Sequence, residues 1–298
     1  MNKETYNECL KYETKDSLKK PIFFYHIPKC GGTTFADLLG IAFEKSLRIS
    51  GTLFENNDKG GMTAFKNFTN NKSKYLKIFE KAEFIYGHLP FLMQEYIGKR
   101  FSTVVIIRDP LERSISHYLW SIARGYINKN EDVEKLFITN KLPANPIFNQ
   151  FTLNNSQTNN QNTKIDLTIK NIEKIDYICK LENVFDLIKL IISKYNKPNL
   201  LFQNRQTNLN RITPPQNIID IIKKYNLIDI KIYKELIKKN LFKNFYKQNN
   251  LGVNDSYIYF STKQGVLIDN KNMCYIKKDQ IDLVKKNLIL AGYKIKTY

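Results

Sequence analysis

The fold of this chain is decided by one stretch, which reads Pro21-Ile22-Phe23-Phe24-Tyr25-His26-Ile27-Pro28-Lys29-Cys30-Gly31-Gly32-Thr33-Thr34-Phe35-Ala36-Asp37-Leu38-Leu39-Gly40. It opens with an apolar run of β-branched and aromatic residues, Ile22 to Ile27, which is typical of a buried strand. Pro28 ends that strand, because proline has no N–H to donate to a ladder. After a tight turn, an amphipathic helix is expected to begin at Thr33 and to end near Ser46.

A strand, a glycine turn and a helix N-terminus in this order form an anion site, because free backbone N–H groups and the positive end of the helix dipole point at one spot. Gly31 and Gly32 let the backbone approach a bound anion closely. Thr33 and Thr34 add hydroxyl donors, and Lys29 adds a full charge. The stretch therefore predicts a phosphate or sulfate site; an ordinary strand-to-helix turn with a solvated lysine is the alternative.

This turn differs from the nucleotide-triphosphate loop. That loop places its lysine after the last glycine, as Gly-Lys-Ser/Thr, and its hydroxyl group holds a magnesium ion. Here Lys29 precedes both glycines, and no Gly-Lys-Ser/Thr follows.

The composition indicates a folded α/β protein. The 298 residues suffice for one large domain and an appendage, and 42% apolar with 13% aromatic residues exclude a disordered chain. No run approaches the ~18 consecutive apolar residues that a membrane helix needs. Residues 1–20 are polar and mixed in charge, so they are expected to be neither a signal peptide nor an anchor.

The cysteines and the net charge bear on the cellular compartment and on the binding partners. Cys9, Cys30, Cys179 and Cys274 lie far apart without a Cys-x-x-Cys pair. This spacing argues against a zinc site or a disulfide framework and favours a reducing cytosol. The net charge of +19 has two interpretations: a solvated surface rich in lysine, or an attraction for an anionic cofactor or an acidic polymer.

Two further strands are expected to end in polar residues. The run Phe84–Tyr86 breaks at Gly87 and leaves His88 at its C-terminal end, where ligands bind in open α/β sheets. Ser102–Ile107 reads as a central parallel strand that ends at Arg108. Asp109 as N-cap and Pro110 as first residue then predict a helix to about Arg124, which carries Ser116.

The remaining chain continues the alternation of strands and helices. Residues 125–163 are expected to be irregular, with a mobile loop or lid over 149–163. A strand is expected over 176–181, and helices over 164–174, from Asn183 onward, over 214–225 and over 227–239. This order predicts a P-loop-like, doubly wound parallel sheet flanked by helices.

Three segments are expected: a polar lead-in over 1–20, an α/β domain over 21–248, and a small C-terminal α+β module over 249–298. In the module, short strands are expected over 257–260, 266–269, 273–276 and 293–298, with a helix over 279–290.

The chain resembles the sulfotransferases that use 3'-phosphoadenosine 5'-phosphosulfate (PAPS), in particular the glycan-modifying branch that includes heparan sulfate 2-O-sulfotransferases. Members open with His-Ile-Pro-Lys-Thr-Gly-Gly-Thr-Ser, and His26–Thr34 here reads His-Ile-Pro-Lys-Cys-Gly-Gly-Thr-Thr. Their Gly-His is matched by Gly87-His88, and their Arg-x-Pro-x-x-Arg-x-x-Ser-x-Tyr block by Arg108–Tyr118. Cys30 departs from the usual threonine and is a poorer donor.

The resemblance implies sulfuryl transfer from PAPS to a hydroxyl group of a carbohydrate acceptor, neutral or acidic, with release of adenosine 3',5'-bisphosphate and without a metal. Lys29 is expected to neutralise the departing 5'-phosphate oxygen, and His88 to remove the proton of the acceptor hydroxyl. Arg108 and Ser116 are expected to grip the 3'-phosphate. The implied cofactor-binding residues are Lys29, Cys30, Gly31, Gly32, Thr33, Thr34, Arg108 and Ser116.

Some residues have a structural alternative. Arg108 would then form a surface ion pair with Glu112 or Asp109, and His88 would only pack. His26 is expected to pack, and no catalytic role is expected for His117.

The expected protein is a cytoplasmic sulfotransferase, because Golgi relatives carry an N-terminal membrane helix that this sequence does not show. No nucleic-acid partner is expected. The alternatives are a P-loop kinase or nucleotide hydrolase that depends on magnesium, a basic nucleic-acid-binding protein with salt-sensitive affinity, and an inactive family member.

Overall fold

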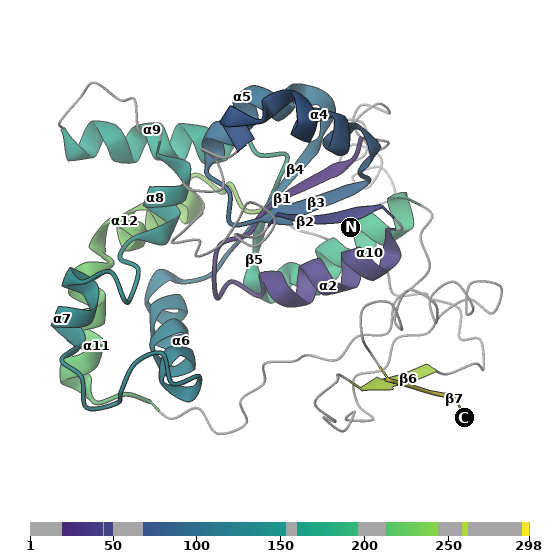
Figure 1. Cartoon of the computed structure of the whole chain (residues 1–298). Helices are drawn as coiled ribbons and strands as arrows, with labels where there is room; N and C mark the ends of the chain where they lie inside the picture. The colour runs from purple at the N-terminus through teal and green to yellow at the C-terminus, as the bar shows by residue number, and fades with distance from the viewer. Residues whose placement is uncertain are drawn as a thin grey trace, which may run out of the picture.

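A five-stranded parallel sheet forms the centre of the molecule (Figure 1). The computed structural model describes residues 20–43, 45–49, 68–152, 160–195 and 213–243, together with the backbone of two strands near the C-terminus. The strands of the sheet lie in the order β2-β3-β1-β4-β5. Their bounds are Ile22–Tyr25 for β1, Ser46–Ile49 for β2, Phe84–Gly87 for β3, Ser102–Ile107 for β4 and Tyr177–Lys180 for β5.

Helices cover both faces of the sheet, so the predicted doubly wound α/β fold is confirmed. Helices α2 and α10 lie together on one side, and α4, α5 and α9 lie on the other (Figure 1). The bounds are Gly32–Ala42 for α2, Lys72–Lys81 for α4, Gln94–Ile97 for α5, Gln161–Glu173 for α9 and Val184–Lys194 for α10. Because β1 pairs with both β3 and β4, the carboxyl ends of these three strands meet at the point where the strand order reverses.

The core explains the unbroken apolar runs of the central strands. All four residues of β1 are at most 1% exposed, and all six residues of β4 are buried. Phe23, for example, packs its ring against Tyr25 and Phe101. Truncating such a side chain to alanine typically costs about 3–5 kcal/mol.

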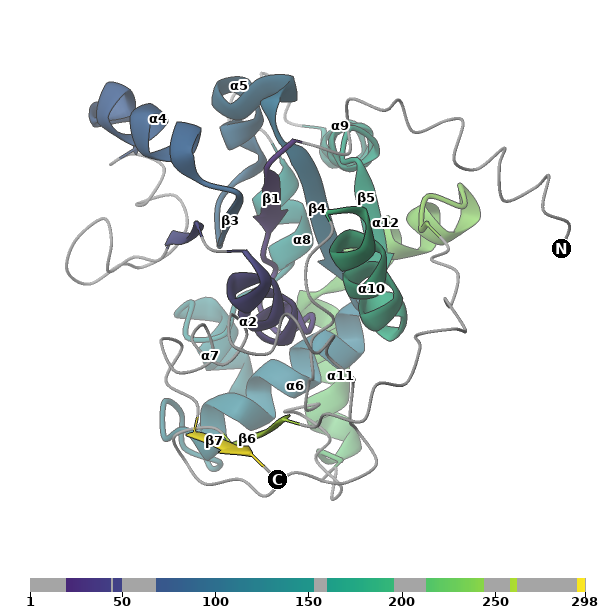
Figure 2. The ribbon, with the colours of Figure 1, turned by 90° about the vertical axis from the view of Figure 1, so that its right-hand side faces the viewer.

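A second layer of helices lies beyond the carboxyl ends of the strands (Figures 1 and 2). It contains α6 (Pro110–Ala123), α7 (Val133–Ile138) and α11 (Gln216–Tyr225). These helices share a hydrophobic cluster of their own, made by Tyr118, Ile127, Val133, Leu136, Phe137, Leu142 and Ile222. The layer holds α6 close to the ends of β1 and β4.

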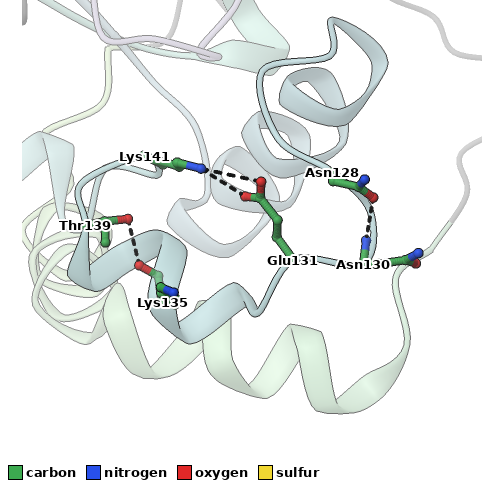
Figure 3. A network of polar contacts seen from close by, with 6 residues as sticks. All are labelled: Asn128, Asn130, Glu131, Lys135, Thr139 and Lys141. Atoms are coloured by element: carbon green, nitrogen blue, oxygen red, sulfur yellow. Dashed lines mark hydrogen bonds and ion pairs between the residues drawn. The ribbon is translucent and has the colours of Figure 1, made fainter.

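The expectation of an irregular segment over 125–163 is wrong. The segment contains α7, α8 (Pro146–Phe151) and the start of α9, while residues 153–159, the centre of the expected lid, lie outside the described residues. Local polar contacts order the turns of this segment (Figure 3). Lys141 forms an ion pair with Glu131 at 3.3 Å, and the Thr139 hydroxyl donates a hydrogen bond to the Lys135 carbonyl oxygen. Asn128 accepts a hydrogen bond from the amide of Asn130 in the same network.

A buried carboxylate ties α8 to helix α12 (Leu227–Lys238). Asp229 is 0% exposed, and its oxygens accept hydrogen bonds from the amides of Ile147 and Phe148 at 2.9 and 2.8 Å. Burial raises the pKa of Asp229 to about 6, while the two amides and the charge of Arg113 oppose that rise. Arg113 of α6 is itself 0% exposed, and its charge acts on Asp229 where α6 packs against α12.

The other predicted elements agree with the structure except at their ends. Helix α2 ends at Ala42 rather than near Ser46, because Ser46 begins edge strand β2. Helix α10, expected from Asn183 onward, begins at Val184, and a 3-10 turn, Leu181–Asn183, precedes it. Further 3-10 turns lie at Phe91–Met93 and Gly98–Arg100.

Near the C-terminus, β6 (Ile258–Ser261) and β7 (Lys294–Thr297) pair antiparallel, which confirms the strands predicted over 257–260 and 293–298. The other elements predicted for the module, and the lead-in up to residue 19, lie outside the described residues. The domain boundaries stay a prediction. Among the helices that the structure describes, none is long and apolar enough to cross a membrane.

Candidate functional site

The turn after β1 has the unusual backbone that the sequence led us to expect. Lys29 and Gly31 both adopt positive φ, 67° and 73°. A non-glycine residue in this region is uncommon, and such strained positions concentrate at functional sites. Within the described residues no side chain caps α2, so the amides of its first turn are left for solvent or an anion.

The two glycines of the turn are required for different reasons. Gly31 supplies the left-handed conformation, and a Cβ atom there would also overlap the side chain of Leu181. Gly32 has ordinary φ, but a Cβ atom there would overlap the ring of His26. The space beside Gly32 is thus filled by an imidazole, which lies at the end of β1.

Lys29 lies among other cationic groups. Its ammonium nitrogen is 5.0 Å from the centre of the Trp120 ring, a cation–π contact with α6. Burial, together with the positive charges of Arg108 and Arg124, lowers the pKa of Lys29 to about 8. A bound anion would relieve that repulsion, so the cluster favours a negatively charged ligand.

His88, at the end of β3, is held by His26. Its Nδ1 lies 2.8 Å from the His26 carbonyl oxygen, and the two rings stack with 4.4 Å between their centres. A carbonyl oxygen only accepts hydrogen bonds, so in the neutral ring Nδ1 carries the hydrogen and Nε2 carries the lone pair. The His88 side chain is exposed, as a base that meets a substrate must be.

His26 packs, as expected from the sequence. Its ring stacks on Phe24 as well as on His88. Burial lowers the pKa of His26 well below its usual value, and the charges of His88 and Arg48 act in the same direction, so its ring stays neutral.

Arg108 and Ser116 follow β4 and are both half-buried. The guanidinium of Arg108 forms the ion pair with Glu112 that the alternative interpretation expects, at 3.2 Å. The Arg108 side chain is 12% exposed, but that of Glu112 is 50% exposed, so water screens the carboxylate and the pair contributes little stability. A guanidinium has five N–H donors, so a single carboxylate contact leaves donors for another anion.

Cys30 lies beneath the turn rather than on its surface. It is 1% exposed, and burial raises the pKa of its thiol to about 11 even though the Arg113 charge and the backbone N–H of Arg108 oppose that rise. Its amide donates to the Ile27 carbonyl oxygen at 3.4 Å. A contact of Cys30 with a cofactor stays a prediction, as do the contacts of Thr33, which is exposed, and Thr34, which is half-buried.

The structure adds His117 and Trp120 to the candidate residues. Burial, together with the charges of Arg113, Lys29 and His88, lowers the pKa of His117 to about 4, so His117 lies within electrostatic reach of both predicted catalytic residues. The spacing of three residues places His117 and Trp120 on one face of α6. Sequence reasoning does not show which neighbour this face meets, because packing against α11 and α12 sets the helix rotation.

The site therefore combines a cationic turn, an exposed imidazole and an arginine at the ends of β1, β3 and β4. Such a site can stabilise charge on a transferring anionic group and accept a proton. Within the part of the chain that the structure describes, no three His, Cys, Asp or Glu side chains gather closely enough to hold a metal ion.

Comparison with known proteins gives one family. Residues 13–187 match the model of the "Sulfotransferase family". The chain is also similar to a solved structure titled "Crystal Structure of Sulfotransferase from Alicyclobacillus acidocaldarius", at 12% identity and a TM-score of 0.39, over 74% of this chain and 96% of that chain. No curated protein matches the chain.

Two glycines of α2 test the packing of the turn. We expect Gly32→Ala to lower the free energy of unfolding by about 1–3 kcal/mol, because the His26 ring must move. Gly40→Ala is the matched control, since a Cβ there lies 3.7 Å from the Ser46 hydroxyl and gains up to ~1 kcal/mol of helix propensity. Urea denaturation measures both, and equal effects would contradict the role of Gly32.

Proposed function

This chain belongs to the sulfotransferase family, and we propose that it transfers the sulfuryl group of PAPS to a hydroxyl group of a carbohydrate acceptor. The observation that carries the proposal is that Lys29, His88 and Arg108 follow three adjacent parallel strands, with β1 in the middle. In this proposal the turn with Lys29 binds one phosphate, His88 is the base and Arg108 binds the other phosphate. All three lie along one edge of the sheet.

The turn after β1 binds the 5' end of the nucleotide in this proposal. The amides of Gly31 and Gly32 and the hydroxyl groups of Thr33 and Thr34 donate to the 5'-phosphate. Lys29 neutralises the charge that develops on the departing phosphate oxygen, for which its protonated form is required.

Arg108 and Ser116 bind the 3'-phosphate. An arginine fork and a hydroxyl group suit a phosphate, and ATP has no phosphate at that position. The exposed carboxylate of Glu112 holds the guanidinium in place until the phosphate binds, at little cost because the pair is weak.

His88 acts as the general base. Its Nδ1–H donates to the His26 carbonyl oxygen, which fixes the tautomer and leaves Nε2 to take the proton of the acceptor hydroxyl. As that proton leaves, the acceptor oxygen bonds to sulfur, and the bond between sulfur and the phosphate oxygen breaks. Adenosine 3',5'-bisphosphate and the sulfated acceptor are the products.

The acceptor is proposed to be a carbohydrate, and the cationic cluster of Lys29, Arg108 and Arg124 favours one with acidic groups. The reaction needs no metal in this scheme, because the charges come from side chains and backbone amides. A cytoplasmic location is proposed from the spacing of the cysteines.

Nucleotide binding tests whether one site binds both the 5'-phosphate and the 3'-phosphate. Adenosine 3',5'-bisphosphate should raise the melting temperature, while ATP with magnesium and AMP should do so only slightly. Arg108→Ala removes the charged contacts to the 3'-phosphate, so it should lower the affinity for adenosine 3',5'-bisphosphate about 10- to 100-fold. The affinity for AMP should not change. Arg100→Ala, which removes an exposed arginine paired with Glu80, is the control. Equal shifts from all nucleotides would refute the 3'-phosphate site.

Transfer from radiolabelled PAPS to a panel of sugars tests the base. We expect His88→Ala to lower kcat at least ~100-fold, because the acceptor proton then has no base, while adenosine 3',5'-bisphosphate still binds. Full activity in His88→Ala would mean that another group takes the proton.

The pH dependence of binding tests Lys29. Since a bound anion favours protonated Lys29, the affinity for adenosine 3',5'-bisphosphate should fall as the pH rises through about 8, where free Lys29 loses its proton. Lys29→Arg keeps its charge, so isothermal titration calorimetry of this variant should show no such fall. An identical fall in both proteins would assign the titration to another group.

A further inference from the structure

His117 lies one ring away from Lys29. Both contact the same side chain, Trp120 of α6, whose ring is 5.8 Å from the His117 ring and 5.0 Å from the Lys29 ammonium nitrogen. Helix α6 lies just beyond the carboxyl ends of the central strands in both views (Figures 1 and 2). His117 is therefore separated from the turn by a single side chain.

His117 also feels the charges of Lys29 and His88. In the proposed reaction these two residues act on opposite sides of the moving sulfuryl group, Lys29 on the departing oxygen and His88 on the attacking one. The Trp120 ring that His117 contacts also lies against the Lys29 ammonium, so in the proposed reaction His117 lies near the departing oxygen. Because His117 stays neutral at physiological pH, it does not compete with His88 for the acceptor proton.

The Nδ1 nitrogen of His117 lacks a hydrogen bond within the described residues. This nitrogen is also buried. Leaving a buried polar atom unpaired is unfavourable, so such atoms are rare, and each calls for an explanation such as an absent ligand.

We propose that Nδ1–H of His117 donates a hydrogen bond to a non-bridging oxygen of the sulfuryl group of PAPS. This inference rests on the proposed function. During transfer the charge of the group is spread over its three non-bridging oxygens, and a donor fixed beforehand on a packed helix stabilises that charge without having to reorganise. His117 would then recognise the transferring group itself, whereas Arg108 and the turn recognise the nucleotide.

The affinities of two nucleotides that differ only in the sulfuryl group test this. His117→Phe keeps a ring against Trp120 but has no donor, and should weaken PAPS about 10-fold while changing adenosine 3',5'-bisphosphate less than about twofold. His117→Asn places an amide nitrogen near the position of Nδ1 and should restore most of the PAPS affinity. Titrations without acceptor measure both constants, and thermal unfolding checks each fold.

The control is Tyr126→Ala, which removes a 65% exposed ring that also contacts Trp120, and which should leave the ratio of the two affinities unchanged. Equal weakening of both nucleotides in His117→Phe, or no change in either, would overturn the inference. Failure of His117→Asn to restore PAPS affinity would overturn the donor role. If the unmodified protein bound neither nucleotide, the proposed function would fall, and this inference with it.

Discussion

The hydrogen-bonded register of β1 between β3 and β4 is the constraint on which the site depends. Tyr25 lies beside Gly87 on one side and beside Val105 on the other, and the amide of His26 continues the ladder by donating to Gly87. A slip of one residue would turn every side chain of β1 to the opposite face. The aromatic residues of β1 pack on both faces of the sheet, Phe23 against Phe101 and Phe24 against Phe35, and a slip would lose these contacts. The core therefore fixes the relative positions of the strand ends that Lys29, His88 and Arg108 follow.

His26 contacts both the turn after β1 and His88 at the end of β3. Its ring fills the space that Gly32 leaves open, and its carbonyl oxygen accepts the hydrogen bond that orients His88. The same residue thus shapes the turn after β1 and selects the tautomer of the neighbouring imidazole. Its own neutrality follows from burial, so it adds no positive charge that would raise the cost of protonating His88.

Local signals in the sequence were sufficient for the strands and for the turn. The run Ser102–Ile107 matches β4 residue for residue, and Asp109 caps α6 through the amides of Leu111 and Glu112. Helix α8 could not be predicted in this way, because its cap, Asp229, lies 82 residues from Ile147 along the chain. The place of His117 was missed for the same reason, since tertiary packing decides which face of α6 meets the turn.

Trp120 is the only tryptophan of the chain, and its indole touches the Lys29 ammonium and the His117 ring. Indole fluorescence responds to nearby charge, so a change in the electrostatic state of this edge registers in the emission of a single fluorophore. The molecule thus carries an intrinsic optical reporter of its own site, and occupancy can be followed without attaching a dye.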